Sequence, residues 1–290
     1  MDRKENKRQE EKSAVRHLIA QWVSFLLVFA FFSATAMGLA EPEAEKTRAD
    51  TIELTQEIKT PDGFTIRLPA GWVSIPRDVL DSYANKIARN APNLANQRLD
   101  YGFQLSTSRN WFEYPYIMVQ IKRTGRIPES QLESLDQVQR GMNKGLGQTQ
   151  QSMSGVISDA HLGKTTYDPS LHILWSRISA NVTGIGVVKG LCAVLLTEDG
   201  VIQIISYAMD RDFERSAPLF EEIAKNAVVD DNLRYKPRLT DKVPVAGSGN
   251  GSAAYNMGYD IGRGFGTALF WGLVLIVFFK IASWIFKRVR

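Results

Sequence analysis

The side chains that could support catalysis or metal binding are few and widely spaced in this chain. Two of its three histidines, His161 and His172, lie far from both ends, and Asp159 stands two residues before the first. If these segments pair as strands, Asp159 and His161 share one face, with His172 opposite. Metal sites usually need three or four ligands at a recognisable spacing, and the sequence has no His-Glu-x-x-His or paired-cysteine motif. Surface histidines are the simpler interpretation, and we predict no metal site.

The other reactive groups also lack a motif. Cys192 is the single cysteine and lies in the apolar run 191–196, which favours a buried small side chain over a catalytic thiol. The acidic pairs near 210 and 230 lack the calcium-loop spacing, and the serines at 152–158 lack a Gly-x-Ser-x-Gly turn. The glycine-rich stretch 184–190 lacks the phosphate-loop spacing. We therefore predict no catalytic residue, no cofactor and a protein that is not an enzyme.

An aromatic cluster is the most informative candidate for binding. It surrounds Pro115 and consists of Trp111, Phe112, Tyr114 and Tyr116. One interpretation is packing in the core or across strands. The other is an exposed patch that binds a protein partner or the outer lipid surface, because such side chains often anchor interfaces.

Glycines recur at every fourth position before the last apolar run. They are Gly258, Gly262 and Gly266. Small residues at this spacing let two helices approach closely, so they are candidates for helix packing and for a homo-oligomer through the C-terminal helix. The alternative is a flexible glycine-rich lead into the apolar run.

Apolar runs near both ends predict a membrane protein. Residues 261–286 contain enough apolar residues for a transmembrane helix, followed by a basic tail at 287–290. Residues 1–40 have a charged start and a long apolar run, typical of a signal peptide cleaved near Ala40 or of an uncleaved signal anchor. Because basic residues are concentrated after the last run, we expect a cytoplasmic C-terminus and a periplasmic main domain at the inner (cell) membrane.

The distribution of charge argues against a nucleic-acid partner. Six of the 35 Lys and Arg residues lie within residues 1–17, and five more lie from Arg263 onward. The stretch between them has 24 basic and 27 acidic residues, so the main domain is mildly acidic. Basic flanks of this kind suit anionic lipid headgroups on the inner side of a membrane.

The periodicity of the chain predicts an α+β fold with an antiparallel β-sheet covered by helices. The turn at 198–200 joins two apolar runs and predicts a hairpin. Apolar residues at spacings of three and four predict amphipathic helices. The expected strands are 64–68, 72–75, 101–107, 116–124, 171–182, 187–197 and 201–209, and the expected helices are 77–90, 128–153 and 211–229.

The opening of the domain resembles a known family. Residues 63–72 read Gly-Phe-Thr-Ile-Arg-Leu-Pro-Ala-Gly-Trp, similar to the strand, Leu-Pro break and Gly-Trp pair that begin Mog1/PsbP-like domains. The hairpin and helix at 201–229 resemble the end of such domains. The resemblance covers residues 60–231 and implies a central antiparallel sheet between helices. It also implies binding or assembly rather than catalysis, because relatives include photosystem subunits and a regulator of a small GTPase.

These observations predict a membrane-tethered, outward-facing module that binds an envelope protein partner. The alternatives are an envelope enzyme, such as a hydrolase, with an unrecognised site, and a subunit of a membrane complex that packs through its C-terminal helix. The expected parts are a leader or anchor at 1–40, a tether at 41–60, the globular domain at 61–231, a flexible linker at 232–260, the transmembrane helix at 261–286 and the tail at 287–290.

Overall fold

The computed structural model describes residues 52–90, 92, 98–132, 134–242, 254–264 and 266–268. The expected leader at 1–40 and most of the expected transmembrane helix, from residue 269 onward, lie outside the described residues. Within the described ranges, no helix is both long and apolar enough to cross a membrane.

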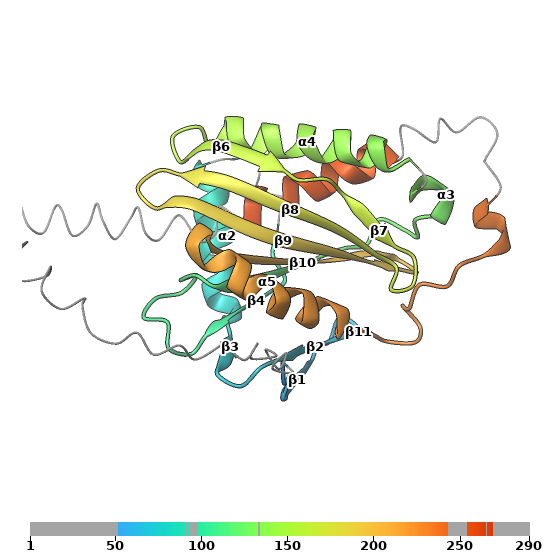
Figure 1. Ribbon diagram of the computed structural model, residues 1–290, viewed down its shortest axis with the longest axis horizontal. Coiled ribbons are helices and arrows are strands. Elements are labelled where there is room, and N and C mark those ends of the chain that lie inside the picture. Colours follow the sequence, from blue (N-terminus) through green and yellow to red (C-terminus); the bar gives the residue numbers. More distant parts are fainter. Residues whose placement is uncertain are drawn as a thin grey trace, which may run out of the picture. The chain divides into compact units, whose positions relative to one another are not determined.

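The strands of the domain form two antiparallel sheets (Figure 1). The large sheet contains β3 (Trp72–Ser74), β4 (Tyr101–Leu105), β5 (Tyr116–Lys122), β6 (Ile157–Leu162), β7 (Thr166–Asp168), β8 (Ile173–Val182), β9 (Gly186–Thr197) and β10 (Gly200–Met209). Their order is β3-β4-β5-β10-β9-β8-β6, with β7 also paired to β8. The small sheet contains β1 (Gln56–Lys59), β2 (Phe64–Leu68) and β11 (Val228–Val229), in the order β1-β2-β11.

The middle of the large sheet is the predicted hairpin. β9 and β10 pair from Gly200 opposite Thr197 to Met209 opposite Val188. Gly200 has a φ of +151°, and a Cβ there would lie 2.9 Å from the main-chain nitrogen of Thr124, so the turn requires glycine. β10 is buried along almost its whole length, because both faces of the sheet are covered.

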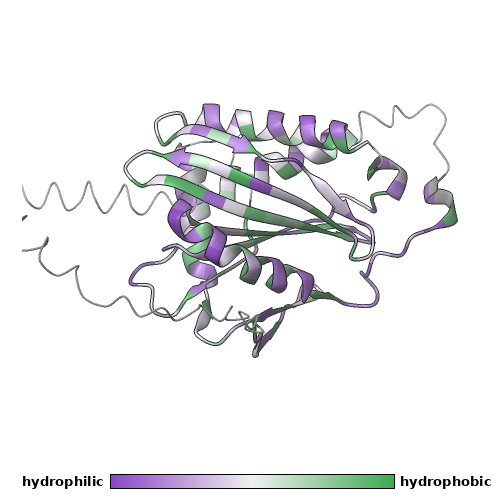
Figure 2. Ribbon diagram, viewed as in Figure 1, coloured by the Kyte–Doolittle hydropathy of each residue, from purple (hydrophilic) through white to green (hydrophobic). Residues whose placement is uncertain are grey.

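Helices cover both faces of the large sheet and create two cores. α2 (Arg77–Asn90) and α4 (Leu135–Ser152) pack on one face, where Leu80, Tyr83 and Met142 are buried. α5 (Asp210–Lys225) and the small sheet pack on the other face, where Phe213 and Phe220 are buried. Figure 2 shows hydrophilic residues along the outer side of α4, as expected for an amphipathic helix. The α+β class with a helix-covered antiparallel sheet is therefore confirmed.

A further helix runs over residues 254–264 and 266–268; we call it the 254–268 helix. It lies beside α4, in red in Figure 1. On α4, a Cβ at Gly141 would lie 2.7 Å from the main-chain nitrogen of Tyr259, and one at Gly145 would lie 2.8 Å from that of Arg263. Glycine at these positions is what allows the two backbones to touch.

Several segments differ from their sequence-based expectation. The expected tether at 41–60 contains β1, which is paired with β2. The expected linker at 232–260 contains the buried Tyr235, the 3₁₀-helix η2 (Leu239–Lys242) and the first turns of the 254–268 helix. The expected helix at 128–153 is divided into α3 (Glu129–Leu132) and α4. Tertiary packing forms the described elements of the expected tether and linker, and the weak local pattern of these two segments does not reveal them.

The helix expected at 211–229 also has different limits. α5 begins at Asp210, so Pro218 lies inside the helix rather than in its first turn. Asp210 and Asp212 in the first turn stabilise the earlier start, because carboxylates interact favourably with a helix N-terminus. The last residues of the expected helix form β11 instead, which pairs with β2.

Candidate functional site

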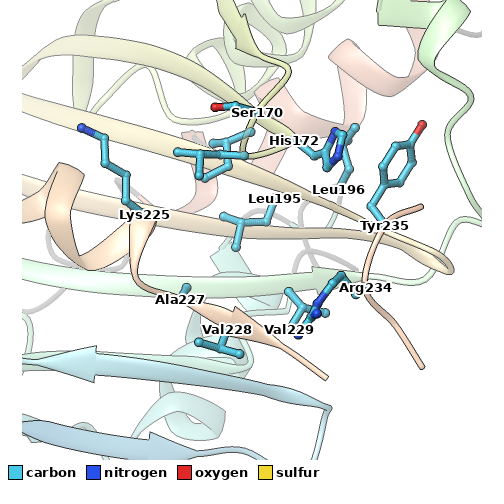
Figure 3. Close-up of a pocket in the computed structure, with 12 residues that line it drawn as sticks. Ser170, His172, Leu195, Leu196, Lys225, Ala227, Val228, Val229, Arg234 and Tyr235 are labelled. Carbon is cyan, nitrogen blue, oxygen red and sulfur yellow. The ribbon is translucent and has the colours of Figure 1, made fainter. Parts of the chain in front are cut away.

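A pocket of about 400 Å³ lies between one end of the large sheet and strand β11 (Figure 3). Its lining comes from the β7–β8 turn and the start of β8, from β9, from the end of α5 and the following β11, and from the segment after β11. The lining residues are Ser170, Leu171, His172, Ile173, Leu195, Leu196, Lys225, Ala227, Val228, Val229, Arg234 and Tyr235.

The β7–β8 turn is ordered by one carboxylate. Asp168 Oδ1 accepts hydrogen bonds from the Ser170 hydroxyl at 2.6 Å, from the Ser170 N–H at 2.9 Å and from the Leu171 N–H at 3.2 Å. These bonds favour the charged form, so the pKa of Asp168 is below its ordinary value. The turn ends with His172 in the left-handed region, at a φ of +53°. Few non-glycine residues adopt this conformation, so local contacts must stabilise it.

His172 is positioned by two aromatic side chains. Its Nδ1 lies 3.1 Å from the Tyr167 hydroxyl, and its ring centroid lies 5.0 Å from that of Tyr235. Figure 3 shows the His172 and Tyr235 rings next to each other at one side of the pocket. The Tyr235 hydroxyl donates to the Ile127 carbonyl at 2.8 Å, and burial raises the pKa of Tyr235 to about 12. Burial also raises the pKa of Tyr167, so both phenols stay protonated near neutral pH and act as structural contacts.

Arg126 does not line the pocket but contacts Tyr235, which does. Its guanidinium lies 4.5 Å from the Tyr235 ring centroid. It donates to both Asp241 oxygens, at 2.7 and 2.5 Å, and to Glu198 at 3.0 Å. The bonds from Arg126 lower the pKa of Asp241, and burial opposes them. Burial acts to raise the pKa of Glu198, but bonds from the Lys236 N–H, from Arg126 and from Arg238 lower it overall. This network stabilises the wall.

The rim of the pocket combines exposed apolar and basic side chains. Leu171 is 41% exposed and Val228 is 39% exposed, which is unusual for large apolar residues. Lys225 and Arg234 are also exposed, and Figure 3 shows them on opposite sides of the apolar lining. Among the described residues, each forms a surface ion pair, Lys225 with Glu221 at 3.5 Å and Arg234 with Asp231 at 2.8 Å. Such exposed pairs contribute about 0–1 kcal/mol, so an incoming anion can compete for them.

This arrangement is suited to binding. An apolar group can insert between Leu171 and Val228 while a carboxylate reaches Lys225 or Arg234. Among the described residues, no group of three or more His, Cys, Asp or Glu side chains could bind a metal ion. The sequence does not reveal this pocket, because its residues come from four separated segments. The signal in the sequence was the apolar pair Val228-Val229 followed at once by acidic residues, within a segment that we expected to be helical.

A second cavity of about 480 Å³ lies between the small sheet, α2 and β4. Its carboxylates are already engaged. Asp62 accepts from the Tyr101 hydroxyl at 2.5 Å and pairs with Arg123 at 3.1 Å. Asp100 accepts from the Ile121 N–H at 2.7 Å, and burial raises its pKa. These bonds connect the small sheet to β4 and β5, which explains their presence without a ligand.

The aromatic cluster lies mostly in the core, which corrects the expectation of an exposed patch. Phe112 and Tyr116 are both 0% exposed, and Trp111 and Tyr114 are half-buried against the same core. The Phe112 ring centroid lies 4.6 Å from that of Tyr83 on α2 and 6.2 Å from that of Tyr116. Phe112 has a φ of +62°, and its N–H donates to the buried Gln104 at 2.7 Å. Its bond to Gln104 helps turn the ring inward.

The two histidines of the domain are not brought together. His161 lies on β6 opposite Ser179 of β8, whereas His172 lies in the turn before β8. The two strands pair, but the pairing does not place His172 opposite His161. His161 is largely exposed, and its Nε2 lies 2.8 Å from Asp159. Cys192 is fully buried on β9, and burial raises the pKa of its thiol well above the ordinary value. A protonated, buried thiol is a poor nucleophile.

The glycines at every fourth position pack against α4 of the same chain. A Cβ at Gly258 would lie 2.9 Å from Val138 Cα, one at Gly262 would lie 2.7 Å from Met142 Cα, and one at Gly266 would lie 2.5 Å from the Thr149 side chain. In this packing, α4 covers the glycine face of the 254–268 helix, which we expected to contact a second chain. Ile261 and Ala268 are buried in this contact, so the expected transmembrane segment begins with residues that pack on the domain.

The 254–268 helix covers polar groups on the sheet. Gln120 on β5 and Gln203 on β10 lie opposite each other, and both are buried. Gln120 Oε1 and both amide atoms of Gln203 have no hydrogen-bond partner among the described residues. Lys122 Nζ donates to the carbonyl of Asp260, and burial lowers the pKa of Lys122 to about 8. Each unmet buried group costs about 1–3 kcal/mol, so the close packing of the helix and bonds such as that from Lys122 must offset this cost.

The described part of the chain is thus an α+β domain with one pocket suited to binding, and comparisons with known proteins add little to this. No family model and no curated protein matches the chain. Among solved structures, the chain is similar to the solution structure of cyanobacterial PsbP (CyanoP) from Synechocystis sp. PCC 6803, with 15% sequence identity and a TM-score of 0.39. That match covers 60% of this chain and 91% of the other.

Proposed function

We propose that this protein is a non-catalytic binding module that recognises an extended segment of an envelope protein partner. The observation that supports this most directly is the rim of the pocket, where the exposed apolar residues Leu171 and Val228 line the same pocket as the basic residues Lys225 and Arg234. Exposed apolar side chains beside basic ones suit a peptide with an apolar anchor and a nearby carboxylate.

The main chain next to the pocket can contribute to this recognition. β11 is an edge strand of the small sheet and pairs with β2 on one side. An extended peptide can add to such an edge through main-chain hydrogen bonds while its side chains enter the neighbouring pocket. The apolar lining provides affinity, and Lys225 and Arg234 select segments that have an acidic residue close to the anchor.

We also propose that the chain is tethered to the inner membrane, with this domain in the periplasm. The apolar run before the basic tail at 287–290 supports this, and so does the leader at 1–40. The test is a pair of reporters fused after Arg290, one active only in the cytoplasm and one active only outside. Activity of the outside reporter alone would refute the proposed topology.

The binding proposal is tested by site-specific photocrosslinking of the full chain in intact membranes. A photoreactive amino acid at Leu171 is expected to capture a discrete partner. The same group at Leu239, which is 89% exposed and does not line the pocket, is the matched control. The change Val228→Asp should abolish the product at position 171, because it places a carboxylate in the apolar part of the rim. Equal capture from both positions, or a product that persists with Val228→Asp, would refute the proposed site.

A further inference from the structure

The direction of the 254–268 helix is defined first by its contacts with α4. Gly258 lies against Val138 near the start of α4, and Gly266 lies against Thr149 near its end. The two helices therefore run parallel, and the 254–268 helix advances towards the C-terminal end of α4.

Contacts with β5 define the same direction independently. Lys122 at the end of β5 donates to the carbonyl of Asp260. The Tyr116 hydroxyl at the start of β5 lies 3.5 Å from the carbonyl of Ala268. The helix therefore runs antiparallel to β5, and its last described residue lies where the β4–β5 loop enters that strand.

The strand register shows which other loops share this end of the domain. Tyr116 lies opposite Tyr207 on β10, and Tyr207 lies opposite Gly190 near the start of β9. The β8–β9 turn at 183–185 is therefore at the same end as the β4–β5 loop at 106–115. We call these two segments the loop end. Arg109 and Asn110 are exposed there, and the half-buried Trp111 lies beside them.

The pocket lies at the other end of the sheet. It is lined by Ile173, the first residue of β8, whereas the loop end follows Val182, the last residue of that strand. β8 has ten residues, and a strand rises about 3.3 Å per residue. The pocket is therefore about 30 Å from the loop end along this strand.

We propose that the loop end rests on the headgroup layer of the outer face of the inner membrane, with the pocket directed away from the bilayer. This inference depends on the proposed membrane tether. Ala268 is buried on the domain, and the uncharged stretch 269–279 follows it directly in the sequence. With the proposed span beginning in this stretch, the sequence has no separate linker between Ala268 and the span. Arg109, Asn110 and Trp111 at the loop end suit contact with phospholipid headgroups. The exposed carboxylate of Glu113 in the same loop accepts hydrogen bonds from the Arg109 and Asn110 N–H groups.

The test uses spin labels on full-length protein in vesicles of phosphatidylethanolamine and phosphatidylglycerol with a small fraction of nickel-chelating lipid. One label is attached at Asn110→Cys and the control label at Leu239→Cys, which belongs to η2 at the pocket end. Cys192 is buried, so the unchanged chain measures background labelling. Headgroup nickel is expected to enhance relaxation of the label at position 110 severalfold more than that of the label at position 239.

The outcomes separate the two proposals. If the protein does not float with the vesicles on a density gradient, the membrane tether fails, and this inference fails with it. If the protein floats but the two labels relax equally, or the label at position 239 relaxes more, the tether stands and the orientation is refuted. A severalfold difference in the expected direction supports both.

Discussion

The reciprocal glycine contact between α4 and the 254–268 helix can be tested with two substitutions in one helix. Gly145 and Gly147 both lie in the last two turns of α4. A Cβ at Gly145 would overlap the Tyr259 carbonyl and lie 2.8 Å from the Arg263 nitrogen, whereas a Cβ at Gly147 would meet nothing within 4 Å. Gly145→Ala and Gly147→Ala therefore add the same methyl group, the first against a packed backbone and the second into open space.

The expected magnitudes have opposite signs. Alanine stabilises a helix interior by about 1 kcal/mol relative to glycine, so Gly147→Ala should raise the free energy of unfolding by up to about 1 kcal/mol. At Gly145 the same gain is opposed by overpacking, which costs about 1–3 kcal/mol, because main-chain atoms cannot move aside as a flexible side chain can. The net expectation for Gly145→Ala is a loss of up to about 2 kcal/mol.

Thermal unfolding of the detergent-solubilised full chain, followed by circular dichroism, measures this difference. For a chain of this size about 1 kcal/mol corresponds to about 2–4 °C in Tm. The two variants differ by the overpacking cost of about 1–3 kcal/mol, so their Tm values should differ by about 2–12 °C. Hydrogen exchange should also become faster at residues 254–264 in Gly145→Ala and remain unchanged in Gly147→Ala. A Tm for Gly145→Ala equal to or above that of Gly147→Ala would refute close helix contact at this position.

Three further predictions concern single side chains. Folding lowers the pKa of Lys122 from 10.5 to about 8, so between these pH values the unfolded chain binds more protons than the folded chain. The free energy of unfolding should therefore rise with pH in this range. Lys122→Met should remove this rise, as measured by denaturation at pH 7 and at pH 9.5. Arg126→Ala should lower the free energy of unfolding by about 2–3 kcal/mol, because it leaves the 4%-exposed carboxylate of Asp241 without its ion pair with Arg126. The difference in stability between the variant and the unchanged protein should become smaller in acid, as the pH falls through the lowered pKa of Asp241. Phe112→Ala should cost about 3–5 kcal/mol in urea denaturation, whereas Arg109→Ala in the same loop should stay within about 0.5 kcal/mol; equal effects would contradict the buried position of Phe112.

The hairpin at the centre of the large sheet was predictable because its information is local. Two long apolar runs flank a turn that ends with Gly200, and such a turn allows one antiparallel pairing. The helices α2, α4 and α5 were predictable for the same reason, since the spacing of their apolar residues defines one buried face. Their limits shifted where acidic residues or strand pairing competed with periodicity, as at Asp210 and β11.

The binding pocket could not be predicted in this way. Leu171, Lys225 and Arg234 come from three segments that are neighbours only because β11 pairs with β2 and the chain then returns to pair Arg234 with Thr197. β11 has two residues, too few for a period-two pattern to be recognised. The pocket therefore depends on long-range pairings that have no local signature.

The sequence alone determined the α+β class, the central hairpin, the amphipathic helices and the distribution of charge, because each depends on the order of residues over short distances. Only the tertiary structure decided what the glycines and the aromatic residues do. Gly258, Gly262 and Gly266 have a spacing that suits any close helix partner, and the fold provides α4 as that partner. An aromatic run is equally compatible with core and interface, and the inward turn at Phe112 places its ring in the core. Spacing along a chain defines which side chains share a face, whereas the fold determines what that face touches.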